Sequence, residues 1–346
     1  MSLLDEYHAL HRGAGIVDRS SRGRLLLTGA DRRAYLQGLL SNDIAALVPG
    51  SGCYATYLTA QGRMIADMRV FEMGDALLVD LDGTITQAVA DRWDQFIFSE
   101  DVQVENVSAS TAEIGVYGPG AAEVIEAVLY SGRTPREPSP DRSRLASLPV
   151  YGIGRWDFRG VPVFVLSSDD IGVRGFDIVL PVTHTGAVVS LLRLAGAIEA
   201  GGDAAEVCRV EGGRPLFHAD MDEGTIPLEA GIEDRAISLT KGCYVGQEII
   251  IRVLHRGHGR VARKLVGITF DPPATVPARG ERILTGGRDV GSITSAVQSV
   301  ALARPVALGY VHRDFAQPGT AVDVGGRDAR VAVLPFVQHA VSTTAQ

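Results

Sequence analysis

The sequence predicts an α+β protein that ends in a small antiparallel β-barrel or sandwich. Before residue 260, short apolar runs typical of strands alternate with stretches whose apolar residues recur at helical spacing. After residue 260 the helical periodicity disappears, and short β-like runs alternate with Gly, Pro and Asp turns. A chain of 346 residues suits about two to three domains. We therefore expect an N-terminal region of residues 1–258 and a C-terminal domain of residues 259–346, with the boundary near 255–262.

The first elements follow from local patterns. Residues 24–27 are a predicted strand, and a glycine turn separates them from a predicted helix over 34–40. Two strands within residues 70–79 flank a Gly-Asp turn, and residues 84–98 have the apolar spacing of a helix. Residues 114–129 repeat the order of strand, glycine turn and helix, which indicates two related α+β units.

The remaining elements alternate in the same way. Residues 131–148 are rich in Pro, Ser and Arg and are a predicted surface loop. Strands are expected at 161–166 and 176–180, followed by helices over 184–200 and 203–209. Four short runs then form the predicted β domain: 265–270, 283–284, 306–311 and 331–334.

Composition narrows the class of protein. With 46% hydrophobic and 21% charged residues, the chain can bury a core and is not disordered. The net charge of −8 and the lack of a dense Lys/Arg face argue against a nucleic-acid partner. The sequence contains no uncharged apolar run of ~18 residues, so no membrane span is predicted. The first residues do not resemble a secretory signal. We expect a cytoplasmic protein without a disulfide framework, since its three cysteines are widely separated.

Segment 241–248, with the sequence KGCYVGQE, carries the most distinctive chemistry. Lys241 and Lys264 are the chain's only lysines among 33 basic residues, and Lys241 lies two positions before Cys243. A cation near a thiol lowers the pKa of that thiol and increases its thiolate fraction. An inert cysteine in a turn is the alternative, because free Cys is often a core residue. The other motif residues are Gly242, Tyr244, Gly246, Gln247 and Glu248, of which the glycines permit tight turns.

An acidic segment precedes a basic one. Residues 199–234 hold ten carboxylates and two arginines, and residues 241–264 hold six basic side chains and one carboxylate. These segments are either solvated faces or the two halves of a site in which carboxylates bind a donor-rich head and arginines bind an anionic tail. His255 and His258 have metal-ligand spacing, but no Cys or acid lies near them in sequence, so no metal site is predicted.

KGCYVGQE resembles the signature of YgfZ-type folate-binding proteins, which are relatives of the T-protein (aminomethyltransferase) of the glycine cleavage system. The resemblance implies two ferredoxin-like α+β units and a C-terminal antiparallel β-barrel around an opening that binds tetrahydrofolate or a one-carbon derivative. Four further segments resemble T-protein blocks: residues 15–20 (GIVDRS), 36–44 (LQGLLSNDI), 209–213 (RVEGG) and 226–231 (IPLEAG).

The resemblance also implies residue roles. Glu211 matches the glutamate that reads the pteridine, whose amino group and ring N–H suit a bidentate carboxylate. Tyr54 and Asp67 match a folate-contacting tyrosine and the aspartate near the reactive folate nitrogens. Asp80 falls near a folate-contacting asparagine. On charge grounds alone, Arg252, Arg256 and Arg260 are candidates for binding the glutamate tail.

Two departures from the T-protein pattern bear on which function is expected. Only Asp67 remains of a paired aspartate, and residues 175–178 (GFDI) are what remains of a longer block. These differences favour a folate-binding accessory protein for assembly or repair of iron–sulfur clients, with Cys243 activated by Lys241. One cysteine cannot hold a cluster that needs about four ligands, so any cluster contact would be transient. The alternatives are an aminomethyltransferase assisted by Asp67 and a non-catalytic scaffold.

Overall fold

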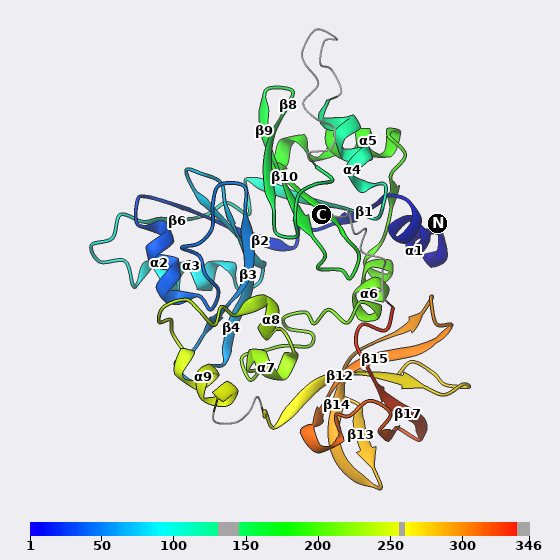
Figure 1. Ribbon diagram of the computed structural model, residues 1–346. Coiled ribbons are helices and arrows are strands. Elements are labelled where there is room, and N and C mark those ends of the chain that lie inside the picture. The colour runs from blue at the N-terminus through cyan, green and yellow to red at the C-terminus, as the bar shows by residue number, and fades with distance from the viewer. Residues whose placement is uncertain (131–144, 256–259, 338–346) are drawn as a thin grey trace.

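The computed structural model describes residues 1–130, 145–255 and 260–337, which form two helix-covered sheets and a closed barrel (Figure 1). The expected α+β class with a C-terminal antiparallel barrel is confirmed. No helix in these described ranges is long and apolar enough to cross a membrane. The cytoplasmic location stays a prediction.

The first sheet is antiparallel throughout, in the order β3-β4-β5-β2-β6. The expected turn lies between β4 and β5, where Gly74 has a φ of 105° that favours glycine. Alternate strand residues such as Leu25, Leu27 and Val79 pack with Trp93 in a core. The elements are β2 (Arg22–Thr28), α2 (Arg32–Leu39), β3 (Gly52–Leu58), β4 (Met64–Glu72), β5 (Leu77–Asp82), α3 (Thr86–Asp94) and β6 (Gln103–Asn106).

The second sheet has the order β11-β1-β7-β10-β9-β8, so the N-terminal strand β1 lies beside strands from much later in the chain. The helix expected over 184–200 is shorter, because α5 ends before Gly196, whose φ is 100°, and residues 198–199 pair with β1. The elements are β1 (Gly15–Asp18), β7 (Thr111–Tyr117), α4 (Ala121–Leu129), β8 (Ile153–Phe158), β9 (Val161–Ser168), β10 (Gly175–Pro181), η1 (Val182–His184), α5 (Thr185–Leu194) and β11 (Ile198–Glu199).

The C-terminal domain is a closed barrel in the order β12-β15-β14-β13-β16-β17, which decides between barrel and sandwich. Its longest strand, β14, was not expected, because Ser, Thr and Gln dilute the apolar signal of residues 288–299. The elements are β12 (Arg263–Phe270), β13 (Arg282–Thr285), β14 (Arg288–Ser299), β15 (Arg304–His312), η2 (Arg313–Phe315), β16 (Ala321–Val324) and β17 (Arg327–Ala332).

Helices join these three bodies (Figure 1). Helix α6 packs against α1 and against the barrel strands β14 and β15, while α8 packs against β3 of the first sheet. The side chains of α6 and α8 can therefore reach the region between the two sheets and the barrel. The elements are α1 (Leu3–Arg12), α6 (Gly202–Glu211), α7 (Pro227–Ala230), α8 (Glu233–Ala236) and α9 (Gln247–His255).

Candidate functional site

Tyr54 and Asp67 meet in a polar cavity of about 150 Å³. They lie on the paired strands β3 and β4, and both point to the sheet face opposite the helical core because strand side chains alternate between faces. Charged groups complete the lining, from strands of the first sheet, from α6 and α8, and from the connections that follow β1, β9 and α6: Arg19, Arg22, Arg69, Asp170, Glu206, Arg209, Arg214 and Arg235. Tertiary structure thus gathers cations that were not predicted as site residues.

Asp67 is the central carboxyl of this cavity. It is 9% exposed, and its Oδ2 accepts a hydrogen bond of 2.7 Å from the hydroxyl of Tyr54. Burial raises the pKa of Asp67, while the charge of Arg22 and the Tyr54 hydrogen bond oppose that rise. A carboxyl with a raised pKa can exchange a proton nearer neutral pH, so this group is suited to general acid–base chemistry.

Tyr54 is held by aromatic and cationic neighbours. Its ring stacks on that of Tyr151, with centroids 6.3 Å apart, and Arg235 lies with its Cζ 4.9 Å from the Tyr54 centroid. Burial raises the pKa of Tyr54 well above its ordinary value, so its hydroxyl remains a donor to Asp67. Tyr151 has a φ of 65°, a left-handed conformation that is uncommon for an aromatic residue and marks local strain.

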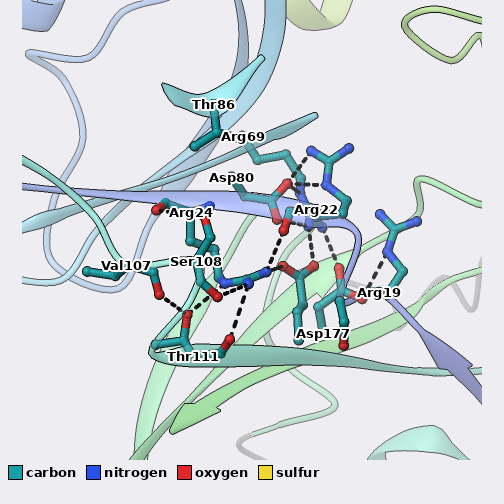
Figure 2. A network of polar contacts seen from close by, with 12 residues as sticks. Arg19, Arg22, Arg24, Arg69, Asp80, Thr86, Val107, Ser108, Thr111 and Asp177 are labelled. Atoms are coloured by element: carbon teal, nitrogen blue, oxygen red, sulfur yellow. Dashed lines mark hydrogen bonds and ion pairs between the residues drawn. The ribbon is translucent and has the colours of Figure 1, made fainter. Parts of the chain in front are cut away.

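A buried network behind the cavity joins the two sheets (Figure 2). Arg69 contacts Asp80 of its own sheet at 3.0 Å, and it reaches Glu113 at 2.9 Å and Asp177 at 2.5 Å in the second sheet. Arg24 adds a hydrogen bond of 2.8 Å from its Nε to Thr111. Burial raises the pKa of Glu113 well above its ordinary value, and nearby Asp80 and Asp177 add to that rise. These contacts fix the relative position of the two sheets.

Asp80 belongs to this network and not to the cavity lining. It is fully buried, and both Arg22 and Arg69 contact its carboxylate. Although burial acts in the opposite direction, the two guanidinium groups lower the pKa of Asp80. Asp80 thus forms internal ion pairs, and the folate contact expected of it stays a prediction.

Glu211 also lies away from the cavity. Its Oε2 accepts from the Tyr7 hydroxyl at 2.6 Å, and its Oε1 accepts from the Ser299 hydroxyl at 2.6 Å and the Ala301 N–H at 3.1 Å. Five residues earlier on α6, Glu206 lines the cavity instead, because a shift of five positions turns a side chain to another helix face. Glu211 therefore joins α1 and the barrel to α6, and the pteridine contact expected of it stays a prediction.

Lys241 caps a helix that is distant in sequence. Its ammonium donates to the carbonyls of Gln37 at 2.6 Å, Leu40 at 2.6 Å and Asn42 at 3.0 Å, at the C-terminal end of α2. Burial lowers the pKa of Lys241 to about 8. Carbonyls at this end of a helix lack intrahelical partners, so the lysine satisfies them.

The structure directs the Lys241 ammonium to the end of α2, and the expected activation of Cys243 by Lys241 stays a prediction. Cys243 is exposed, whereas the lysine is buried against α2. Burial raises the pKa of the Cys53 thiol to about 12, and the charge of Lys241 opposes that rise. The lysine side chain points back to α2, which its position in the sequence does not reveal.

Replacing Lys241 with Met is expected to lower the free energy of unfolding by about 1–3 kcal/mol, because buried carbonyls would lose their donors. Urea unfolding followed by circular dichroism measures this difference. Lys264→Met is the matched control, since Lys264 is exposed on β12. Equal effects of the two substitutions would contradict the capping role.

The other motif residues contribute shape. Gly246 has a φ of 84°, and a Cβ there would come within 2.5 Å of the Thr59 carbonyl, so only glycine fits. A Cβ at Gly242 would meet open space. Tyr244 is buried, and the Lys241 ammonium lies 5.0 Å from the centroid of its ring. Helix α9 begins at Gln247, and Glu248 lies in its first turn.

The arginines expected to bind a ligand tail do not line the cavity. Arg252 on α9 and Arg260 are exposed, and neither belongs to the lining. Arg256 and His258 lie outside the described residues, as do residues 131–144 of the expected surface loop. Arg69 could have been noticed from the sequence, because it is a charged residue two positions from Asp67 on the same strand face.

A larger cavity of about 890 Å³ lies elsewhere, on the helical side of the first sheet. Its lining includes Tyr35, Tyr57, Phe96 and Val245, and it contains none of the predicted folate residues. We assign the functional site to the smaller cavity because perturbed ionisable groups converge there.

The chain folds into two helix-covered sheets and a closed barrel, and a charged cavity lies between the sheets. This arrangement is the one expected of T-protein-like proteins. The chain matches the family described as "GCVT N-terminal domain" over residues 1–241 and the "Glycine cleavage T-protein C-terminal barrel domain" over residues 263–338. It therefore belongs to the glycine cleavage T-protein family.

Several relatives match over nearly their full length. An aminomethyltransferase of Thermosynechococcus vestitus is 29% identical, with 99% of this chain and 90% of that protein covered. An aminomethyltransferase of Cutibacterium acnes is also 29% identical, with coverage of 97% and 90%. The crystal structure of glycine cleavage system aminomethyltransferase T from Bartonella henselae superposes with a TM-score of 0.84 at 22% identity, covering 97% of this chain and 90% of that chain.

These comparisons correct the functional expectation. The similar proteins carry the name aminomethyltransferase in several species, and the structural neighbour is a glycine cleavage T-protein. The expected role as an accessory protein for iron–sulfur assembly or repair is therefore wrong. The alternative prediction, an aminomethyltransferase, is the better supported of the two.

Proposed function

We propose that this chain is a tetrahydrofolate-dependent aminomethyltransferase, which transfers a one-carbon unit from an amine donor to tetrahydrofolate. The observation that carries the proposal is Asp67, a buried carboxyl with a raised pKa, oriented by Tyr54 inside a charged cavity. Family membership and the names of the full-length relatives support it.

The residues present fit a folate. A pterin ring carries N–H donors that suit the carboxylate of Asp67, and its flat face suits the aromatic side chain of Tyr54. Arginines of the lining suit the carboxylates of the glutamate tail. The cavity is smaller than the ~300–1,000 Å³ of whole-ligand pockets, so it would hold one end of such a ligand.

Tetrahydrofolate, when bound, supplies the nitrogens that accept the one-carbon unit. Two folate nitrogens bond to the methylene carbon, which in turn loses its bonds to the amine nitrogen and to the lipoyl sulfur of the donor. Asp67 would accept the proton that one nitrogen loses and would pass it to the leaving ammonia, while the proton of the other nitrogen goes to the leaving thiolate. Tyr54 holds Oδ2 of Asp67, which keeps the carboxylate in one orientation. The positive charge of Arg22 favours the ionised, proton-accepting form of Asp67.

The direct test supplies tetrahydrofolate and a lipoyl protein whose thiol carries an aminomethyl group. We expect methylenetetrahydrofolate and ammonia in equal amounts, above the rate without protein. Cys243→Ala is the matched variant, and it should keep full activity because Cys243 is exposed and lies outside the cavity lining. Failure to form methylenetetrahydrofolate, or loss of activity in Cys243→Ala, would count against the proposal.

Tyr54→Phe is expected to move the acidic limb of the rate profile to higher pH. The Tyr54 hydrogen bond lowers the pKa of Asp67, so its loss raises that pKa, and more alkaline solution is then needed to ionise the base. Below the midpoint the rate should fall about fivefold, which corresponds to a hydrogen bond worth about 1 kcal/mol. A pH–rate profile from 5 to 9 measures this, and an unchanged midpoint would contradict the assigned coupling.

We propose that residues 241–248, which resemble the YgfZ signature, reflect kinship with YgfZ-type proteins inside the T-protein family and nothing more. It implies no iron–sulfur role. The structural contacts of Lys241 and Gly246 account for two residues of this segment by packing alone.

A further inference from the structure

The arginines that line the cavity around Tyr54 and Asp67, called the central cavity below, differ in how their charge is balanced. Six of them line it, and five lie within 4.0 Å of a carboxylate. These five pairs are Arg19 with Asp170, Arg22 with Asp80, Arg69 with Glu113, Arg209 with Asp220, and Arg214 with Asp169. Their charge is therefore already compensated by the protein.

Arg235 is the sixth, and no carboxylate of the described residues forms an ion pair with it. Its Nη1 donates a long hydrogen bond of 3.4 Å to the Tyr151 hydroxyl, and its Cζ lies 4.9 Å from the Tyr54 ring centroid. Its backbone carbonyl accepts from Asn42 at 2.9 Å, which anchors α8 to the first sheet. The guanidinium is thus positioned by two aromatic residues and a fixed backbone.

A partly buried guanidinium without a carboxylate within 4.0 Å has lost hydration that its aromatic neighbours only partly replace. The charges of Asp169 and Asp170 act on Arg235 only from farther away. An arginine offers five N–H donors in a planar fork, and a carboxylate can accept two of them side by side. A ligand carboxylate would therefore complete the contacts of Arg235. The five paired arginines would first have to give up an internal partner.

We propose that Arg235 binds a carboxylate of the ligand that occupies the central cavity. This rests on the function proposed above, under which the carboxylate is that of the folate glutamate. Arg235 would thus take the role first expected of the exposed Arg252 and Arg260, and the ligand would lie across the Tyr54 ring towards Asp67.

The test uses three probes: tetrahydrofolate, 6-methyltetrahydropterin, which lacks the carboxylates, and p-aminobenzoylglutamate, which lacks the pterin. Dissociation constants are measured by calorimetry for the wild type, Arg235→Met and Arg235→Lys. We expect Arg235→Met to weaken tetrahydrofolate and p-aminobenzoylglutamate by about tenfold or more, as for loss of a charge-assisted hydrogen bond. Binding of 6-methyltetrahydropterin should stay within about twofold, and Arg235→Lys should recover part of the loss.

Arg193→Met is the control, since Arg193 is exposed and paired with Glu199 outside the cavity. An equal loss for 6-methyltetrahydropterin would overturn the proposal, because Arg235 would then act only by positioning Tyr54. Unchanged binding of tetrahydrofolate in Arg235→Met would also overturn it. If the wild type binds p-aminobenzoylglutamate through Arg235 but neither pterin, the carboxylate site stands and the proposed function fails.

Discussion

Replacing Asp67 by asparagine is expected to lower the rate of one-carbon transfer by about 10²–10⁴-fold, the usual contribution of a general base. Asparagine keeps the size of the side chain and can still accept from the Tyr54 hydroxyl, but it cannot take a proton. The affinity for tetrahydrofolate should change much less than the rate. Single-turnover rates and dissociation constants, measured on the same preparation, separate the two effects.

Asp203→Asn is the matched control for this substitution, because Asp203 is exposed in the first turn of α6. It should leave both rate and affinity unchanged. A rate in Asp67→Asn within about threefold of the wild type would remove Asp67 from the chemistry, since a general base contributes far more than that. The cavity would then remain only a binding site.

The largest effect on stability is expected for Arg69→Met. Arg69 is 1% exposed and contacts Asp80, Glu113 and Asp177, so its loss leaves buried carboxylates without their counter-charge. Breaking a buried ion pair by removing one partner costs about 3–5 kcal/mol. Urea unfolding of the whole chain, followed by tryptophan fluorescence, measures the difference.

Arg69→Lys keeps the charge but not the fork of donors, and it should lose less than Arg69→Met. Arg282→Met is the surface control, because Arg282 and its partner Asp289 are both exposed. That pair should contribute about 0–1 kcal/mol. A loss below about 1 kcal/mol in Arg69→Met would mean that the buried carboxylates are neutral without the arginine.

Much of the architecture followed from periodicity. The alternation of apolar runs before residue 260 and the turn-rich β pattern after it predicted two α+β units and a barrel, both of which the structure has. Helix α1 and strand β14 were missed. Helix α1 packs against α6, which is distant in the chain, so local pattern carries little of that information. Strand β14 pairs with its neighbours β13 and β15, but its polar residues weaken the apolar signal.

The site was predicted less completely than the fold. Tyr54 and Asp67 were expected to share a site, and the antiparallel pairing of β3 and β4 brings them into contact. Glu211 and Asp80 were expected there too, but internal donors occupy their carboxylates. A charged residue in a motif can be bound by the ligand or by the protein, and sequence alone does not distinguish the two.

The class of fold, the T-protein family likeness and the Tyr54–Asp67 pair could be read from the sequence alone, because all three depend on spacing along one chain. Which charges face the cavity depends on how the elements pack in three dimensions. Arg22, Glu206 and Arg235 come from different elements, and the rotation of each strand or helix sets which side chain points inward. The same reason directs Lys241 to the end of α2 and leaves Cys243 on the surface.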